Sequence, residues 1–292
     1  MASNTEIRRL GVKGAAAAGL VLVLVMAGSL SLYLMHRNSD YSYTFGAADA
    51  ADRVDVSVWI TRIDPSARTV VVHMNVEPAG ALTDPDGNFG SDTVLTTSAL
   101  GGPMAVKKSD ILLDVERHFW TGSGTVTDYP FDRYSATMSF AASSPDGTAI
   151  PVAVTMWSDD PFFRIAPAES APPDESDQTV EITLSATRST PTLVFAVFVM
   201  VLMLGLSIAA LTASYYILRW RRGLIFPACS MMAAVLFALI PLRNAVPGDP
   251  PIGSVIDFVS FFIAEILIAA ALIASVVIGY RVEIANELDG TD

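Results

Sequence analysis

The sequence predicts an α+β membrane protein with four transmembrane helices, one N-terminal and three C-terminal, and an extracytoplasmic immunoglobulin-like β-sandwich. Two observations predict this fold class. Long apolar segments lie near the start and at the end of the 292-residue chain, and a polar segment with short alternating strands lies between them. A helix crosses the ~30 Å hydrocarbon core of a bilayer with about 20 apolar residues, so each apolar segment is long enough to span it.

The first apolar segment covers residues 14–35 and contains no charged residue. Its basic start and its small residues Ala27, Gly28 and Ser29 are typical of a signal peptide. A cleaved apolar region is usually about 7–15 residues long, and this one is longer. We therefore expect a retained signal anchor after a short N-terminus of residues 1–13.

Three further apolar segments predict the C-terminal helices. They cover residues 191–218, 224–242 and 254–280. The turn 219–223 and the loop 243–253 join them, and residues 281–292 form a tail.

Lys and Arg near the helix ends predict the orientation, because short positively charged loops stay in the cytoplasm. Seven such residues flank one side of the predicted helices, namely Arg8, Arg9, Lys13, Arg219, Arg221, Arg222 and Arg281. Only Arg37, Arg188 and Arg243 flank the other. We therefore expect a multi-pass protein of the cell membrane, with both termini cytoplasmic and residues 36–190 extracytoplasmic.

The charge of the chain is concentrated in this polar segment. Residues 36–190 contain 22 Asp and Glu against 10 Lys and Arg, which accounts for the whole net charge of −12. An acidic exterior repels nucleic acid, so no nucleic-acid partner is expected. The single cysteine, Cys229, lies in a predicted helix, so the polar domain cannot form a disulfide and depends on its apolar core.

Alternating apolar and polar residues predict β-structure in this domain. Residues 53–63 and 68–76 flank the turn Asp64-Pro65-Ser66-Ala67 and predict a hairpin, with Val54, Val56, Val58 and Ile60 on one face. Further β-rich runs cover residues 93–100, 111–115, 131–140, 150–157 and 179–187. About seven short strands at this spacing favour an immunoglobulin-like sandwich. The segment 167–177, rich in Pro, Ala and acidic residues, predicts a long connecting loop.

No enzyme or cofactor signature was found. Asp84-Pro85-Asp86-Gly87-Asn88 begins like a calcium loop, but Phe89 replaces the required glycine and Leu95 the bidentate glutamate, so a turn is favoured. His36, His73 and His118 lack the spacing of metal ligands. Gly122-Ser123-Gly124 lacks the strand-to-helix setting of a nucleophile elbow. We therefore expect a protein without catalytic, metal or cofactor-binding residues.

Two short sequence motifs, called words below, are candidates for structural or interaction roles. The first contains Tyr129, Pro130, Phe131, Asp132, Arg133 and Tyr134. We expect the proline to fix a turn, the three aromatic residues to pack the domain edge, and Asp132 to cap the backbone or pair with Arg133. The second word is the loop 243–253, which includes Arg243 and Pro247 and whose prolines and glycines predict a stiff, non-helical connection packed under the outer domain.

Two carboxylates, Asp257 and Glu265, lie in the last predicted helix. Asp257 is near the outer surface and can reach water or Arg243. Glu265 follows Ser254 by 11 residues, which places it about 16 Å deeper. Burial of a carboxylate there is costly. Three roles remain open for Glu265: an internal bond to Ser207, Thr212 or Ser230, contact with a partner subunit, or a proton relay.

These words resemble an actinobacterial domain-of-unknown-function family of four-helix membrane proteins. The resemblance covers residues 129–134, 243–257 and 261–265, and the helix layout agrees. The layout is also similar to that of an accessory subunit of the mycobacterial Mce lipid importer. This resemblance implies lipid (fatty acid) transport, with membrane lipids, a permease, an ATPase and Mce-domain proteins as partners.

The Pro-Phe-Asp word also resembles the outer domain of pentameric ligand-gated channels. Those channels place all their helices after the sandwich, whereas this chain has an apolar segment before it. We therefore expect a non-catalytic accessory or assembly subunit of a cell-envelope complex. The alternative is a stand-alone membrane receptor or an oligomeric channel subunit with an extracytoplasmic sensing domain.

The charge count makes the topology testable. Single cysteines at Ser3 and Thr291 are expected to resist an impermeant thiol reagent in intact cells, because both termini are predicted to be cytoplasmic. A cysteine at Ser143 is expected to react. Labelling of either terminus in intact cells would reverse the predicted orientation.

Overall fold

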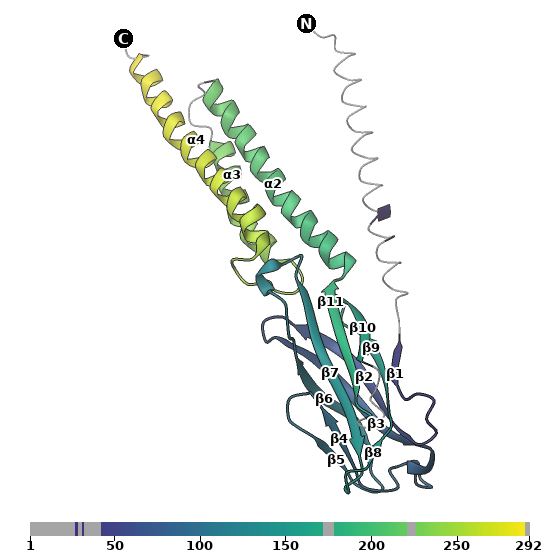
Figure 1. The fold of residues 1–292 in the computed structure, drawn as a ribbon. Coiled ribbons are helices and arrows are strands. Elements are labelled where there is room, and N and C mark those ends of the chain that lie inside the picture. The colour runs from purple at the N-terminus through teal and green to yellow at the C-terminus, as the bar shows by residue number, and fades with distance from the viewer. Residues whose placement is uncertain (1–26, 29–30, 32–41, 172–177, 221–225, 290–292) are drawn as a thin grey trace. The chain divides into compact units, whose positions relative to one another are not determined.

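The computed structural model describes residues 27–28, 31, 42–171, 178–220 and 226–289. Residues 1–41 form a unit separate from the rest of the chain. The predicted first helix, residues 14–35, lies almost entirely outside the described residues. Residues 42–292 form the second unit, in which a β-sandwich is followed by helices (Figure 1).

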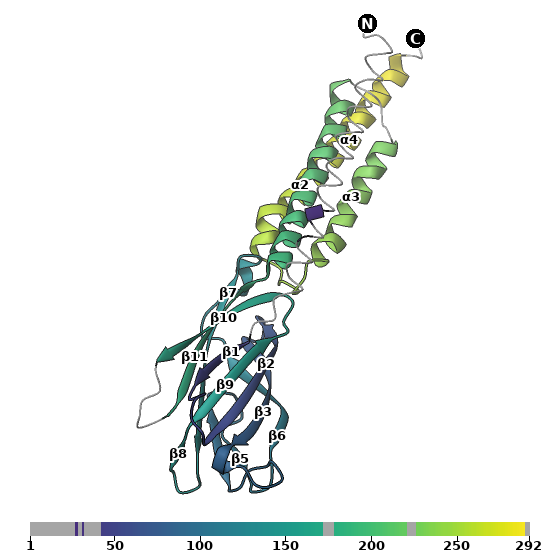
Figure 2. The ribbon, with the colours of Figure 1, turned by 90° about the vertical axis from the view of Figure 1, so that its right-hand side faces the viewer.

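Two sheets form the sandwich, as the alternating pattern predicts. The first is mixed, because β2 and β9 are parallel, and the second is antiparallel. The first contains, in order, β1 (Tyr43–Gly46), β9 (Val152–Ser158), β2 (Arg53–Asp64), β3 (Thr69–Ala79) and β6 (Leu112–Trp120). The second contains β10 (Phe163–Ala171), β11 (Val180–Arg188), β7 (Arg133–Ser143), β4 (Thr93–Thr97) and β5 (Met104–Val106), and β8 (Ala149–Ile150) pairs with β7. Figure 2 shows β9, β2 and β3 side by side in the first sheet.

The predicted hairpin is confirmed, because β2 and β3 pair antiparallel around the Asp64 turn. The Asp64 carboxylate accepts the N–H groups of Ser66 and Ala67, which closes the turn. The predicted inward face is also confirmed, since Val54, Val56, Val58 and Ile60 are all buried. A register shift between Ile60 and Arg62 then changes the parity and turns Ile63 inward.

Three connecting loops, including the turn of the β2–β3 hairpin, lie at the end of the sandwich where β11 continues into the helices. Trp120 pairs with Thr69, so β6 and β3 meet there, and β9 runs parallel to β2 towards the same end. In the other sheet Arg133 pairs with Thr187. We call this the helix-proximal end; its loops are residues 65–68, 121–132 and 159–162, together with Ser189.

Three helices follow the sandwich: α2 (Thr190–Arg219), α3 (Phe226–Asn244) and α4 (Phe262–Asp289), the last preceded by a π-helical turn, η3 (Asp257–Phe261). All three are long and apolar enough to cross a membrane, as the sequence predicts. The N-terminus of α2 is fixed by Ser189, whose hydroxyl donates to the carbonyl of Pro161 and bonds the Thr192 hydroxyl. Short 3₁₀ turns, η1 (Gly80–Leu82) and η2 (Val126–Asp128), lie in the sandwich loops.

Two expectations about the strands are wrong in detail. The described residues contain eleven strands rather than about seven, because the short strands β1, β5 and β8 and the edge strand β10 were not predicted. Residues 167–171, expected in a loop, belong to β10. Pro167 fits there because β10 pairs only with β11, so its missing N–H breaks no ladder on the open side.

Candidate functional site at the junction of sandwich and helices

A buried ion pair joins the end of the last strand to the loop before β7. The Arg188 guanidinium donates from Nε and Nη2 to the Asp132 carboxylate, at 2.9 Å (Nε to Oδ1) and 2.8 Å (Nη2 to Oδ2). The side chains of Arg188 and Asp132 are 2% and 0% exposed. The Tyr134 hydroxyl donates to the same carboxylate at 2.9 Å. Because Arg188 immediately precedes Ser189 and α2, this pair fixes the sandwich where the helices begin.

Strand parity explains why two charged groups are buried here. Along β11 the buried positions are Val180, Ile182, Leu184, Ala186 and Arg188. Along β7 every second residue from Tyr134 onwards is buried, and Asp132, two residues before Tyr134, belongs to the same series. Arg188 on β11 and Asp132, immediately before β7, therefore both point inward. Each provides the partner that makes burial of the other tolerable.

Two aromatic rings enclose the Arg188 guanidinium. Its central carbon lies 4.2 Å from the ring centroid of Phe163 and 4.9 Å from that of Tyr129. Such cation–π contacts are strengthened when the site is desolvated. Tyr129 is itself fully buried and packs in the apolar cluster of α2, α3 and α4 rather than in the sandwich core. One loop of the sandwich therefore contributes to the core of the helices.

The Tyr129 hydroxyl is buried without a hydrogen-bond partner among the described residues. Burial raises the pKa of this phenol to about 12, although the nearby Arg188 and Arg243 guanidinium groups act to lower it. Both arginines therefore act on the same ring. Tyr129 lies between the ion pair of the sandwich and a second ion pair in the helices.

The second ion pair closes the loop between α3 and α4. The Arg243 guanidinium donates to both Asp257 oxygens, at 2.7 Å (Nε to Oδ1) and 2.9 Å (Nη2 to Oδ2), and both side chains are at least nine-tenths buried. Of the two expected environments for Asp257, water or Arg243, the structure shows the second. Asp257 opens the π-helical turn η3, a feature that often accompanies functional positions in helices.

Backbone groups of the loop complete this second site. Arg243 also donates to the carbonyls of Pro250 and Pro251, each at 3.0 Å. The N–H groups of Gly253 and Ser254 donate to Asp257, and the Ser254 hydroxyl bonds the Pro251 carbonyl. The pair thus fixes the second half of the loop, residues 250–254, and Pro247 in the first half is partly buried.

Gly248 brings this loop against the first ion pair. A Cβ at residue 248 would lie 2.5 Å from Nη1 of Arg188, and the residue has a φ of +87°, which disfavours an L side chain. Nη1 is buried and has no hydrogen-bond partner among the described residues. The α3–α4 loop therefore covers Arg188 closely, at a residue whose positive φ favours glycine.

The structure corrects several expectations for the first word. Asp132 pairs with Arg188 and not with Arg133, which is exposed. Phe131 does not pack the domain edge; it is 56% exposed. Tyr134 does pack in the sandwich core, and Pro130 is buried and follows a cis peptide bond.

Glu265 is half-buried in α4. Of the three roles left open, the structure does not show the internal bond: Ser207 donates to the Leu204 carbonyl, Thr212 donates to the Ile208 carbonyl, and Ser230 is exposed. Within the described ranges no hydrogen bond or ion pair reaches the Glu265 carboxylate. Contact with a partner subunit and a proton relay remain as its alternatives.

Sequence reasoning also missed two buried residues of this end, Arg188 and Asp160. The Asp160 carboxylate accepts the N–H groups of Ile63, Phe162 and Phe163, which joins β2 to the β9–β10 loop. Burial raises its pKa despite these bonds. Inward strand parity was the available signal for Arg188. For Asp160 no local pattern distinguishes it from the exposed Asp159.

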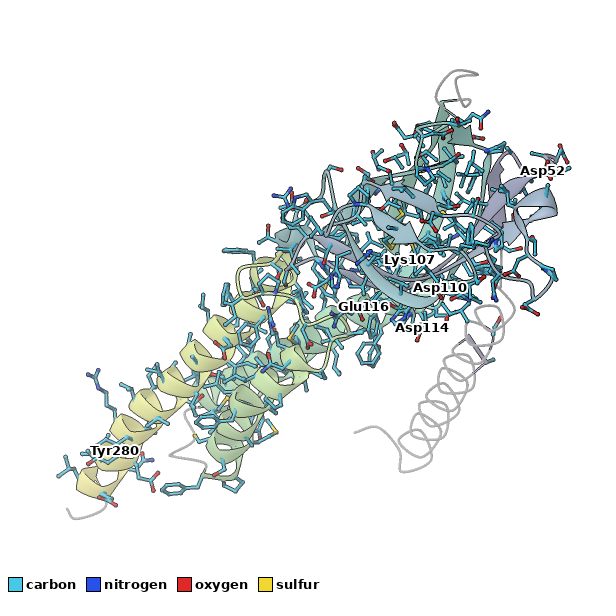
Figure 3. All side chains as sticks on the ribbon, turned by 90° about the horizontal axis from the view of Figure 1, so that it is seen from below. Asp52, Lys107, Asp110, Asp114, Glu116 and Tyr280 are labelled. Atoms are coloured by element: carbon cyan, nitrogen blue, oxygen red, sulfur yellow. The ribbon has the colours of Figure 1, made fainter. Side chains whose placement is uncertain are left out.

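Away from the junction, two histidines of the first sheet, one on β3 and one on β6, each contact acidic side chains on its outer surface. His73 contacts Asp114, with 2.6 Å between Nδ1 and Oδ1, and His118 contacts Glu116, with 3.0 Å between Nε2 and Oε1. Figure 3 labels Asp114 and Glu116 on this surface. The described residues hold no group of three or more His, Cys, Asp or Glu arranged to bind a metal ion. The loop at Asp84 is a turn, as predicted, whose carboxylate accepts the N–H groups of Asp86 and Asn88.

Fold and junction together define an α+β protein in which a two-sheet sandwich is followed by helices able to span a membrane. One buried ion pair lies on each side of the junction, and Tyr129 of the sandwich packs among the helices. Residues 44–184 match a family described as a domain of unknown function (DUF4436), and residues 188–282 match another domain of unknown function (DUF8686). The border between the two matches falls at the end of β11. No curated protein matches the chain.

Asp132→Asn is expected to destabilise the protein strongly, because it leaves the buried Arg188 cation without its counter-charge. Loss of one partner of a buried pair costs about 3–5 kcal/mol. For a protein of this size that corresponds to a fall of roughly 10 °C in the thermal unfolding midpoint. Arg133→Ala, at the exposed neighbour, is the control and is expected to stay near the wild-type midpoint. Equal midpoints for the two variants would contradict the role of the pair.

Tyr129→Phe is expected to leave stability at pH 7 unchanged or higher, since it removes a buried hydroxyl with no partner. The folded pKa of about 12 exceeds the ordinary value of 10.0, so between these pH values the unfolded state loses its proton first. Wild type therefore loses stability as the pH rises through this window, by about 2 kcal/mol at pH 12. Denaturation midpoints measured from pH 7 to 12 are expected to show a smaller alkaline loss in the variant; parallel curves would refute this.

Proposed function

We propose that the protein is a non-catalytic accessory subunit of a cell-envelope membrane complex, and that this complex is an Mce-type lipid importer. The observation that carries the proposal is the junction. Tyr129 of a sandwich loop packs among the helices, and the α3–α4 loop lies against Arg188 at Gly248. A buried ion pair on each side, Asp132–Arg188 and Arg243–Asp257, fixes the parts that meet there. Such a connection suits a subunit that braces a neighbour, because it limits the movement of the sandwich relative to its anchor.

The helices also offer surface for contact with other membrane proteins. Large apolar side chains are exposed on all three helices, among them Val201, Ile208, Phe237, Ile266 and Ile273. Small residues such as Ala209 and Ala213 on α2 permit close approach of a neighbouring helix. Glu265 adds a half-buried carboxylate with no described partner, and a polar group of another subunit is a favourable partner for it inside the bilayer.

The importer is proposed on the resemblance in layout. A non-catalytic subunit with a sandwich outside the membrane and helices within it is the arrangement expected of the Mce accessory subunit. Its partners are then the permease, the ATPase and the Mce-domain proteins, with membrane lipids around its helices. The transported molecule is a fatty acid or a similar lipid.

A second candidate is a receptor or a channel subunit, and the position of Tyr129 favours it. This residue belongs to a sandwich loop but packs among the helices, close to both Arg188 and Arg243. A ligand-induced change in the sandwich would reach the α3–α4 loop along this path. Purification distinguishes the candidates, since a receptor or channel is recovered alone or as a homo-oligomer.

A tagged copy extracted from native membranes in mild detergent is expected to co-purify with permease, ATPase and Mce-domain proteins. Deletion of the gene is expected to reduce uptake of a labelled fatty acid without removing the transporter's ATPase activity. A monodisperse species of about the monomer's mass, together with normal lipid uptake in the deletion strain, would refute the proposal.

Variants at Glu265 test the helix contact in the same purification. Glu265→Gln keeps a neutral hydrogen-bonding group and is expected to retain protein level and partners. Glu265→Lys places a cation within the membrane and is expected to lose both. Should Gln abolish transport while the complex stays intact, Glu265 is a proton relay and not a contact residue.

A further inference from the structure

Exposed aromatic side chains of the sandwich gather at its helix-proximal end. Among the described sandwich residues, the large aromatic side chains that are exposed are Trp120 (58%), Phe131 (56%) and Phe162 (38%). All three lie at the end of β6 or in the loops between β6 and β7 and between β9 and β10. Ile252, 84% exposed, lies in the neighbouring α3–α4 loop.

These side chains lie at the level where α2 begins. The Ser189 N–H donates to the Phe162 carbonyl at 2.8 Å, and α2 starts at the next residue, Thr190. Phe131 directly precedes Asp132, which binds Arg188. Trp120 is the last residue of β6, and the following Thr121 N–H donates to Arg68 in the β2–β3 turn. The three aromatic residues therefore lie at the end of the sandwich from which a helix able to span a membrane begins. Together with Ile252 we call them the aromatic rim.

Charge is distributed unevenly between the two ends of the sandwich. Three exposed arginines, Arg68, Arg133 and Arg164, lie at the helix-proximal end together with two exposed acidic residues, Asp128 and Asp159. Acidic residues crowd the loops of the opposite end, among them Asp49, Asp52, Asp84, Asp86, Asp92, Asp110 and Asp146, and Figure 3 labels Asp52 and Asp110. The excess of negative charge is thus at the end away from the helices, and the helix-proximal end offers arginines that can attract lipid phosphates.

We propose that this rim is a lipid-binding surface, and that Trp120, Phe131, Phe162 and Ile252 insert into the interfacial layer of the bilayer that the helices cross. Aromatic side chains, Trp above all, favour the level of the headgroups, where an apolar ring and a polar edge are both accommodated. Arg68 and Arg133 then contact the phosphates beside them. The occupant is the bilayer itself, because the rim continues directly into the apolar surface of α2. This inference is independent of which complex contains the protein.

Nitroxide labels on the full-length protein test the proposal. In a Cys229→Ala background, Trp120→Cys and Phe131→Cys are labelled and reconstituted into phosphatidylcholine vesicles containing phosphatidylglycerol. Leu113→Cys is the matched control, because Leu113 lies at the opposite end of the same strand and is equally open, at 54% exposure. Collision of each label with oxygen, which concentrates in lipid, and with a water-soluble nickel complex is measured by electron paramagnetic resonance.

Labels at residues 120 and 131 are expected to collide more with oxygen and several-fold less with nickel than the label at residue 113. Equal nickel accessibility at all three positions would overturn the proposal and leave the rim in water. Protection of residues 120 and 131 from both reagents would also overturn it, because it would place protein and not lipid against the rim. Circular dichroism of each labelled variant confirms that the sandwich is folded.

Discussion

The fold depends on one buried contact, the ion pair between Asp132 and Arg188. Arg188 is the last residue of β11 and stands just before α2, and its guanidinium lies under the α3–α4 loop. A buried pair of this kind adds little net stability compared with apolar side chains, but loss of one partner is strongly destabilising. Asp132 and Arg188 therefore matter as a pair, because neither charge can stay buried without the other.

Much of the fold follows from local pattern, and so does part of the junction. Period-two alternation predicts β2 and β3 with the correct inward face, and apolar length predicts α2 and α3 within two residues at each end. The last helix was expected to end at Tyr280, but α4 continues to Asp289 through most of the predicted tail. Edge strands were harder to predict from sequence than the central strands. β10 contains Pro167 and Ala168 within a segment that resembles a loop, and only its pairing with β11 makes it a strand.

The ion pairs of the junction could not be predicted from local sequence alone, because their members come from different strands, helices or loops. Asp132 was expected beside Arg133 because the two are adjacent in sequence, whereas adjacent residues of a strand point to opposite faces. The true partner is 56 residues further along the chain and on the same face of the neighbouring strand. The Arg243 and Asp257 pair was easier to anticipate, since only 14 residues and one loop separate its members. Register, rather than composition, determines which charges meet.

The junction also decides where the chain can be divided. The two domain-of-unknown-function matches separate between Leu184 and Arg188, so a sandwich fragment cut at that border would keep Asp132 and lose its cation. Tyr129 would be exposed in the same fragment, because the helices that bury it are removed. The border between the two families is therefore not a border between independently folding bodies. Arg188 belongs by sequence to the helical part and by structure to the sandwich.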